Sequence, residues 1–186
     1  MDLFEFILVI TSVVYALAMA QVLTGVGRLA QTEATIQWFL PHTLWIVILF
    51  MSILVTWWAG WEFRAVVWVF PKYLYMLITP VSFFFTSSLI IPQSTDAQEV
   101  NLEKHFFKIR APALWAYFIG LLAQFADGPL LASEPMWFPG RVLQIAALCA
   151  VLLGVFAENR RLQALSSIGL LLFFLHVTLT RFWVPG

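Results

Sequence analysis

Residues 168–179, IGLLLFFLHVTL, decide the fold class because they are apolar on every side of a helix. A strand of a membrane barrel would instead alternate apolar and polar residues, and this run does not alternate. A helix needs about 20 apolar residues to cross a hydrocarbon core about 30 Å thick. The apolar character extends on both sides, from about residue 162 to residue 183. This part of the chain therefore predicts a membrane-spanning helix.

Five more segments have the same character. They cover about residues 6–28, 41–61, 71–91, 113–132 and 142–157. The first has no basic residue before it and exceeds the apolar length of a signal peptide, so we expect a retained helix. The longest polar stretch, residues 93–110, is too short for a core of its own. We interpret it as a solvated loop, with a basic amphipathic turn in the headgroup layer as the alternative for its second half. The sequence therefore predicts an all-α, polytopic transmembrane helical bundle in which residues 1–186 form one integral membrane domain with no sizeable soluble part.

The composition excludes several classes of protein. Hydrophobic residues make up 62% of the 186 residues and charged residues only 11%, against about 45–50% and about 25% in a soluble domain. Ten basic side chains balance ten acidic ones, so there is no positive field to hold nucleic acid. One cysteine and no pair of histidines one helical turn apart argue against zinc. We expect the lipid bilayer as a partner, no metal site and no nucleic acid, and the cofactor stays unassigned.

The distribution of Lys and Arg favours a chain whose N-terminus is outside. In that orientation the inner loops carry Arg28, Lys104, Lys108, Arg110, Arg160 and Arg161, and the outer side carries Arg64, Lys72, Arg141 and Arg181. Six basic residues then lie inside and four outside. We expect an inner or plasma membrane of bacterial type, with both termini on the outer side.

Small side chains spaced four residues apart mark faces where membrane helices pack closely. These stripes are Ser12, Ala16, Ala20 and Thr24 in the first segment, Ser52, Thr56 and Gly60 in the second, and Ala146, Ala150 and Gly154 in the fifth. They predict packing within one chain, with an oligomer seam or a pore-lining face as the alternative. We expect either a homo-oligomer or a subunit of a larger membrane complex.

Four polar side chains lie within apolar segments, where such groups are costly without a partner. They are Gln21, Gln124, Asp127 and His176. They are candidate contacts for a proton or cation, although single hydrogen bonds between helices also explain them. Asp127 is followed by Gly128-Pro129 only about fourteen residues after Ala113, which is too short a distance to cross a bilayer. Either the fourth helix begins earlier, near Phe106, or it breaks at Asp127 as helices at ion sites do.

A cluster of aromatic and charged residues follows the second segment. It comprises Trp57, Trp58, Trp61, Glu62, Arg64 and Lys72. Tryptophan prefers the membrane interface, so these residues predict an aromatic belt with an ion-paired group of charges, or alternatively the mouth of a ligand site.

Three classes of function remain. The first is a small oligomeric channel or transporter for ions or small solutes. The second is a non-catalytic accessory or scaffold subunit that holds lipid, quinone or pigment. The third is an enzyme acting on a lipid; this has little support, since only Glu62 with Arg64, or Glu99 and Glu103 with His105, could supply acid–base groups. Haem between two histidines is not expected, because His42 and His176 lie at different depths.

Overall fold

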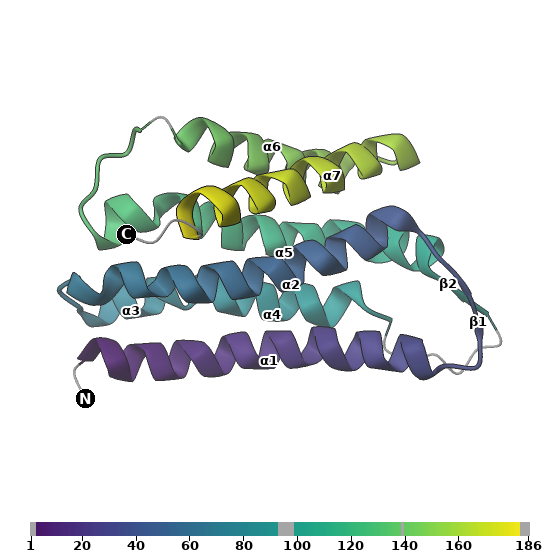
Figure 1. Ribbon diagram of the computed structural model, residues 1–186, viewed down its shortest axis with the longest axis horizontal. Coiled ribbons are helices and arrows are strands. Elements are labelled where there is room, and N and C mark those ends of the chain that lie inside the picture. Colours follow the sequence, from purple (N-terminus) through teal and green to yellow (C-terminus); the bar gives the residue numbers. More distant parts are fainter. Residues whose placement is uncertain (1–2, 93–98, 139, 183–186) are drawn as a thin grey trace.

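The computed structural model describes residues 3–92, 99–138 and 140–182, which are almost entirely helical. The elements in chain order are α1 (Leu3–Gln31), β1 (Thr35–Gln37), α2 (Leu40–Ala59), the 3-10 helix η1 (Gly60–Ala65), α3 (Phe70–Met76), α4 (Ile78–Ile90), β2 (Glu99–Asn101), α5 (Leu102–Leu131), α6 (Arg141–Phe156), α7 (Arg160–Val177) and the π-helical turn η2 (Thr178–Phe182). The helices run side by side along one axis (Figure 1). α1 begins and α7 ends at the same end of the bundle, called here the terminal end, and the two strands lie at the opposite, strand end (Figure 1).

The predicted all-α membrane bundle is confirmed. Within the described residues, five helical stretches are long and apolar enough to cross a bilayer. They are Leu3–Gln31, Leu40–Ala65, Phe70–Ile90, Leu102–Leu131 and Arg160–Thr180. α6 is apolar but has only 16 residues, which extend about 24 Å at about 1.5 Å per residue and fall short of the hydrocarbon core.

α5 differs most from the sequence-based expectation. It begins at Leu102, so the solvated-loop interpretation is wrong for residues 102–110, while residues 93–98 lie outside the described part of the chain. The Asn101 side chain caps the helix by accepting a hydrogen bond from the backbone N–H of Lys104 at 2.8 Å. The helix continues through Asp127 and Pro129 without a break, because neighbouring helices stabilise a proline-containing membrane helix. The alternative of an earlier helix start is the one that holds.

Two short strands join the loops at the strand end. β1 and β2 pair in parallel with Ile36 opposite Val100, which the sequence did not lead us to expect. The pairing connects the α1–α2 loop with the segment that leads into α5.

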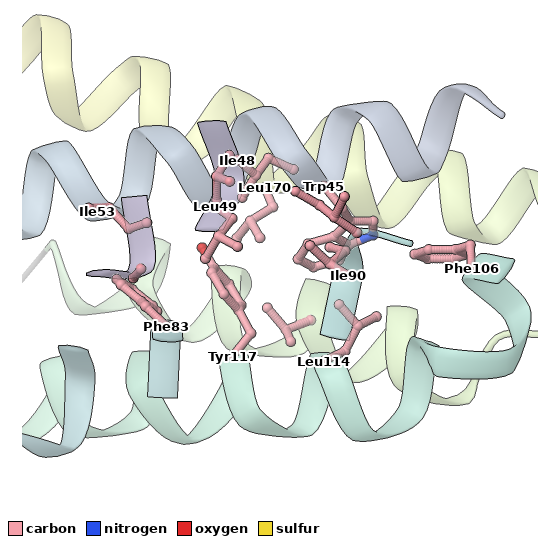
Figure 2. Close-up of a cluster of buried hydrophobic side chains, with 14 of the residues drawn as sticks. Trp45, Ile48, Leu49, Ile53, Phe83, Ile90, Phe106, Leu114, Tyr117 and Leu170 are labelled. Atoms are coloured by element: carbon pink, nitrogen blue, oxygen red, sulfur yellow. The ribbon is translucent and has the colours of Figure 1, made fainter. Parts of the chain in front are cut away.

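The core is a layer of aromatic and branched side chains in the middle of the bundle (Figure 2). The Tyr117 ring on α5 contacts Trp45 of α2 edge-on at 5.6 Å between centroids and stacks on Phe83 of α4 at 5.4 Å. All three side chains are fully buried. The Tyr117 hydroxyl lies 2.6 Å from the Ser52 hydroxyl, so these two buried polar groups are paired with each other.

The three stripes of small residues lie in different environments. In the second stripe, Ser52 of α2 is buried, Thr56 of α2 is half-buried, and Gly60, the first residue of η1, is buried. On α6, Gly154 is buried, Ala150 is half-buried and Ala146 is exposed. On α1, Ser12 is half-buried, and Ala16, Ala20 and Thr24 are exposed. The α1 stripe is therefore not a packing face within one chain, because α1 turns a different side, which includes Tyr15, Ala18 and Val22, toward the bundle.

Candidate functional site

A cavity of about 370 Å³ lies between α2, α5, α6 and α7 toward the terminal end. Its polar lining consists of Thr56, Gln124, Gln144, His176 and Thr180. The other lining residues are Gly140 and apolar side chains. We call this space the main cavity. It brings together Gln124 and His176, two of the four polar residues selected from the sequence, although they lie on different helices.

A second, smaller cavity adjoins the main cavity. It measures about 140 Å³ and shares Thr56, Gln124 and Gln144 with the main cavity. Its lining adds the charged residues Glu62, Asp127, Glu134 and Arg141. We call it the acidic cavity, because three carboxylates face one guanidinium. A positively charged group is favoured there.

Gln124 has an unusual hydrogen-bonding environment. Its side-chain oxygen accepts a hydrogen bond from the Thr56 hydroxyl at 3.4 Å. Its side-chain nitrogen is buried and has no hydrogen-bond partner among the described residues. A buried amide donor without a partner destabilises a protein, and more so in a membrane. A ligand in either cavity could accept the hydrogen bond that this nitrogen does not make within the chain.

Arg141 forms part of the cavity wall. Its side chain is only 2% exposed. It donates hydrogen bonds to the carbonyl oxygens of Phe125 and Met136 and to the Gln144 side chain. The guanidinium also lies 4.6 Å from the Phe125 ring centroid and 4.8 Å from that of Phe138. These contacts hold the positive charge in a fixed position at the wall of the acidic cavity.

Asp127 lies one helical turn after Gln124 on α5. It lines the acidic cavity together with Arg141 of α6. The Tyr75 hydroxyl of α3 donates a hydrogen bond to the carbonyl oxygen of Ala123 at 2.5 Å. The part of α5 that carries Asp127 is therefore held against α3.

The interfacial cluster selected from the sequence is divided among three places. Trp57, Trp58 and Trp61 are exposed and, with Leu8, line an apolar groove of about 320 Å³, here the tryptophan groove. The Arg64 guanidinium lies 5.6 Å from the Trp61 ring centroid.

The other two charges of the cluster lie elsewhere. Lys72 donates a hydrogen bond to the Leu131 carbonyl oxygen at the end of α5, at 2.8 Å. Glu62 lines the acidic cavity. Gln21, the remaining candidate, is half-buried on α1 and lines neither the main nor the acidic cavity.

Sequence reasoning missed one pair of histidines. The rings of His42 and His105 are 5.8 Å apart, and their Nε2 atoms lie 2.7 and 3.2 Å from the Ile90 carbonyl oxygen. The pair could have been found only if α5 had been predicted to begin before His105. Within the described residues no group of three or more His, Cys, Asp or Glu side chains is arranged to hold a metal ion.

The significance of Arg141 was also missed, because the sequence placed it among the outer-side charges. The hydrogen bonds to Met136 and Phe125 that make it a wall residue depend on how the loop after α5 folds back, which no local pattern reveals.

No protein-family model, no curated protein and no solved structure matches this chain. The chain is an integral membrane helical bundle, and its function is inferred from the site alone.

Proposed function

We propose that this chain is a membrane transporter for a small organic cation that also carries a hydrogen-bond acceptor. The observation that carries the proposal is that Gln124 lines both cavities while its buried side-chain nitrogen has no partner among the described residues. A hydroxyl or carbonyl group of the solute would accept this hydrogen bond. Its cationic group would lie toward Asp127 and Glu134 in the acidic cavity.

The size and lining of the cavities support such a solute. Ligand pockets commonly enclose about 300–1,000 Å³ and combine an apolar wall with a few polar groups. The main cavity falls within this range at about 370 Å³. The Arg141 guanidinium is already engaged by carbonyl oxygens and aromatic rings, so it competes little with a cationic solute for the carboxylates.

Closure of the bundle beyond the cavity favours a transporter over an open channel. Ser52 and Ile48 lie one and two helical turns before Thr56 on the same face of α2. Both side chains are fully buried. Tyr117 of α5 and Leu170 of α7 close the same layer and are also fully buried (Figure 2). A cavity that ends at a packed core is what one state of an alternating-access carrier requires.

Counterflow of radiolabelled ethanolamine in proteoliposomes tests the proposal. Ethanolamine is a suitable probe because it combines an ammonium group with a hydroxyl acceptor. We expect counterflow with the wild type and a loss of most of it with Gln124→Leu. Gln21→Leu is the matched control: it removes a half-buried amide of another helix and should transport like the wild type. Absence of ethanolamine counterflow in the wild type, or equal rates for both variants, contradicts the proposal.

A series of competing amines tests the role of the acceptor. Propylamine has a methyl group where ethanolamine has its hydroxyl, so it keeps the charge and loses the partner of Gln124. One hydrogen bond contributes about 0.5–1.5 kcal/mol, so propylamine should compete about two- to thirteenfold more weakly. In Gln124→Leu the two amines should compete equally.

The tryptophan groove supports a second candidate, a non-catalytic accessory subunit that holds a lipid, quinone or pigment. Three exposed indoles beside Leu8 form an apolar surface that a tail or ring could cover. This function predicts that the chain leaves its membrane together with other subunits or a bound small molecule. Native mass spectrometry that detects only masses of this 21.2 kDa chain, in a preparation that transports ethanolamine, contradicts it.

A further inference from the structure

A small cavity on the other side of Asp127 has an unusual lining. It measures about 20 Å³, and its wall combines one carboxylate and four hydroxyl-bearing residues, Asp127, Thr11, Tyr15, Thr56 and Thr79, with Leu8, Trp57, Gly60, Phe63 and Met76. The carboxylate and the hydroxyl-bearing residues come from α1, α2, α4 and α5, four elements that the fold brings together. We call it the hydroxyl cavity. A space needs about 10–15 Å³ to hold one water molecule, so this cavity has room for one occupant of that size.

The three threonine hydroxyl groups of this cavity have already used their protons. Thr11 donates to the carbonyl oxygen of Ile7 at 2.8 Å. Thr79 donates to the carbonyl oxygen of Gly120 at 3.3 Å. Thr56 donates to the side-chain oxygen of Gln124 at 3.4 Å. A hydroxyl has one proton and two lone pairs, so each of these three oxygens can only accept a hydrogen bond or coordinate a cation.

We propose that the hydroxyl cavity binds a single dehydrated sodium ion, with Asp127 and the threonine oxygens as ligands. A hard cation prefers oxygen ligands, and the Asp127 carboxylate neutralises one positive charge inside the membrane. A divalent ion is disfavoured because such ions are held by several carboxylates, whereas this cavity has one. Since Asp127 lines both this cavity and the acidic cavity, sodium binding would change the charge that the solute meets. The coupling role rests on the proposed transport function, but the ion site does not.

Equilibrium binding of ²²Na⁺ to the full-length chain, purified in detergent, tests the site without any transport. We expect saturable binding of one ion per chain that unlabelled sodium displaces and choline does not. Thr79→Val removes one ligand oxygen and should weaken binding at least tenfold, because even the partners of metal ligands contribute about 10–100-fold.

Thr86→Val is the matched control for Thr79→Val. Thr86 lies two turns further along the same helix, is fully buried and also donates to backbone carbonyl oxygens, those of Ser82 and Ala113. It does not border the hydroxyl cavity. We expect Thr86→Val to bind sodium like the wild type. Thr11→Val provides a second ligand variant on a different helix. It keeps the test valid if gel filtration shows that Thr79→Val is not folded.

Two results overturn the sodium site. One is the absence of saturable ²²Na⁺ binding to folded wild type, which would make the occupant a water molecule. The other is wild-type affinity in every folded ligand variant. Ethanolamine counterflow that continues without sodium binding removes the ion site and leaves the transport proposal in place. Sodium binding without ethanolamine counterflow removes the transport proposal and leaves the ion site in place.

Discussion

Gly154 on α6 lies where α6 meets α2, α5 and α7, and its substitution tests the packing of the bundle. A β-carbon added at Gly154 would lie 2.8 Å from the Ser166 hydroxyl oxygen of α7, 3.0 Å from a methyl carbon of Leu114 on α5, and 3.2 Å from the Trp45 ring of α2. Ser166 cannot easily move, because its hydroxyl donates a hydrogen bond to the Ala150 carbonyl oxygen at 2.6 Å. Leu114 and Trp45 are fully buried. Gly154→Ala must therefore displace a helix or a packed side chain.

The expected loss follows from two opposing effects. Overpacking a well-packed core costs about 1–3 kcal/mol. Alanine in place of glycine favours the helix by up to about 1 kcal/mol. The net effect of Gly154→Ala should therefore be a loss of about 1–2 kcal/mol in the free energy of unfolding, equivalent to a factor of about 5–30 in the unfolding equilibrium.

Gly169→Ala is the matched control. Gly169 lies in the middle of α7 with no atom within 4 Å of an added β-carbon. Only the gain in helix propensity remains, so this variant should be as stable as the wild type or up to about 1 kcal/mol more stable. Titration with sodium dodecyl sulfate, followed by ellipticity, measures both variants. Equal stability changes at the two glycines would refute the packing of α6 against α7, α5 and α2.

Two further substitutions test local interactions by the same titration. Asn159→Ala removes the side-chain oxygen that accepts a hydrogen bond from the Arg161 N–H at 2.8 Å and so caps α7; it should cost about 1 kcal/mol, and Asn159→Asp should cost much less. If Asn159→Asp lost as much stability as Asn159→Ala, the capping hydrogen bond would not be the cause of the loss. Arg141→Lys keeps the charge but cannot hold the carbonyl oxygens of Phe125 and Met136 in the same planar arrangement, so it should cost about 2 kcal/mol. Unchanged stability would place Arg141 at a solvated surface.

The fold class was predictable from the sequence because apolar length is a local property. The runs that form α1, α2 and α7 are each long enough to require a membrane, whatever they contact. The start of α5 was not predictable in the same way. Residues 102–110 carry Lys104, Lys108 and Arg110, and so many charges in one short stretch are typical of a solvated loop. Contacts with other parts of the chain make this stretch helical. Arg110 contacts the Ala157 carbonyl oxygen and Glu158, and Glu103 pairs with Arg160, so the α6–α7 turn stabilises this polar first part of α5.

The candidate site was predictable in part. Asp127 and Gln124 attract attention in any apolar segment because of the cost of placing them there. Their grouping with His176 and Arg141 depends on tertiary contacts. The exposed stripe on α1 illustrates the opposite case: Ala16, Ala20 and Thr24 have a packing pattern that one chain does not use.

A main cavity that is open at the terminal end and ends at the packed layer is the central claim of this account, and cysteine labelling in oriented vesicles measures it most directly. The single native cysteine, Cys149, is exposed and is first replaced by serine. Thr56→Cys then places a thiol in the main cavity, and Ser52→Cys places one a helical turn deeper, in the fully buried layer beside Tyr117. We predict that a membrane-impermeant thiol reagent added at the terminal end labels the Thr56 variant and does not label the Ser52 variant. Equal labelling of the two positions from that end would reveal a water path past the packed layer, and no labelling at position 56 would mean that the cavity is closed at that end, so either result would contradict the account.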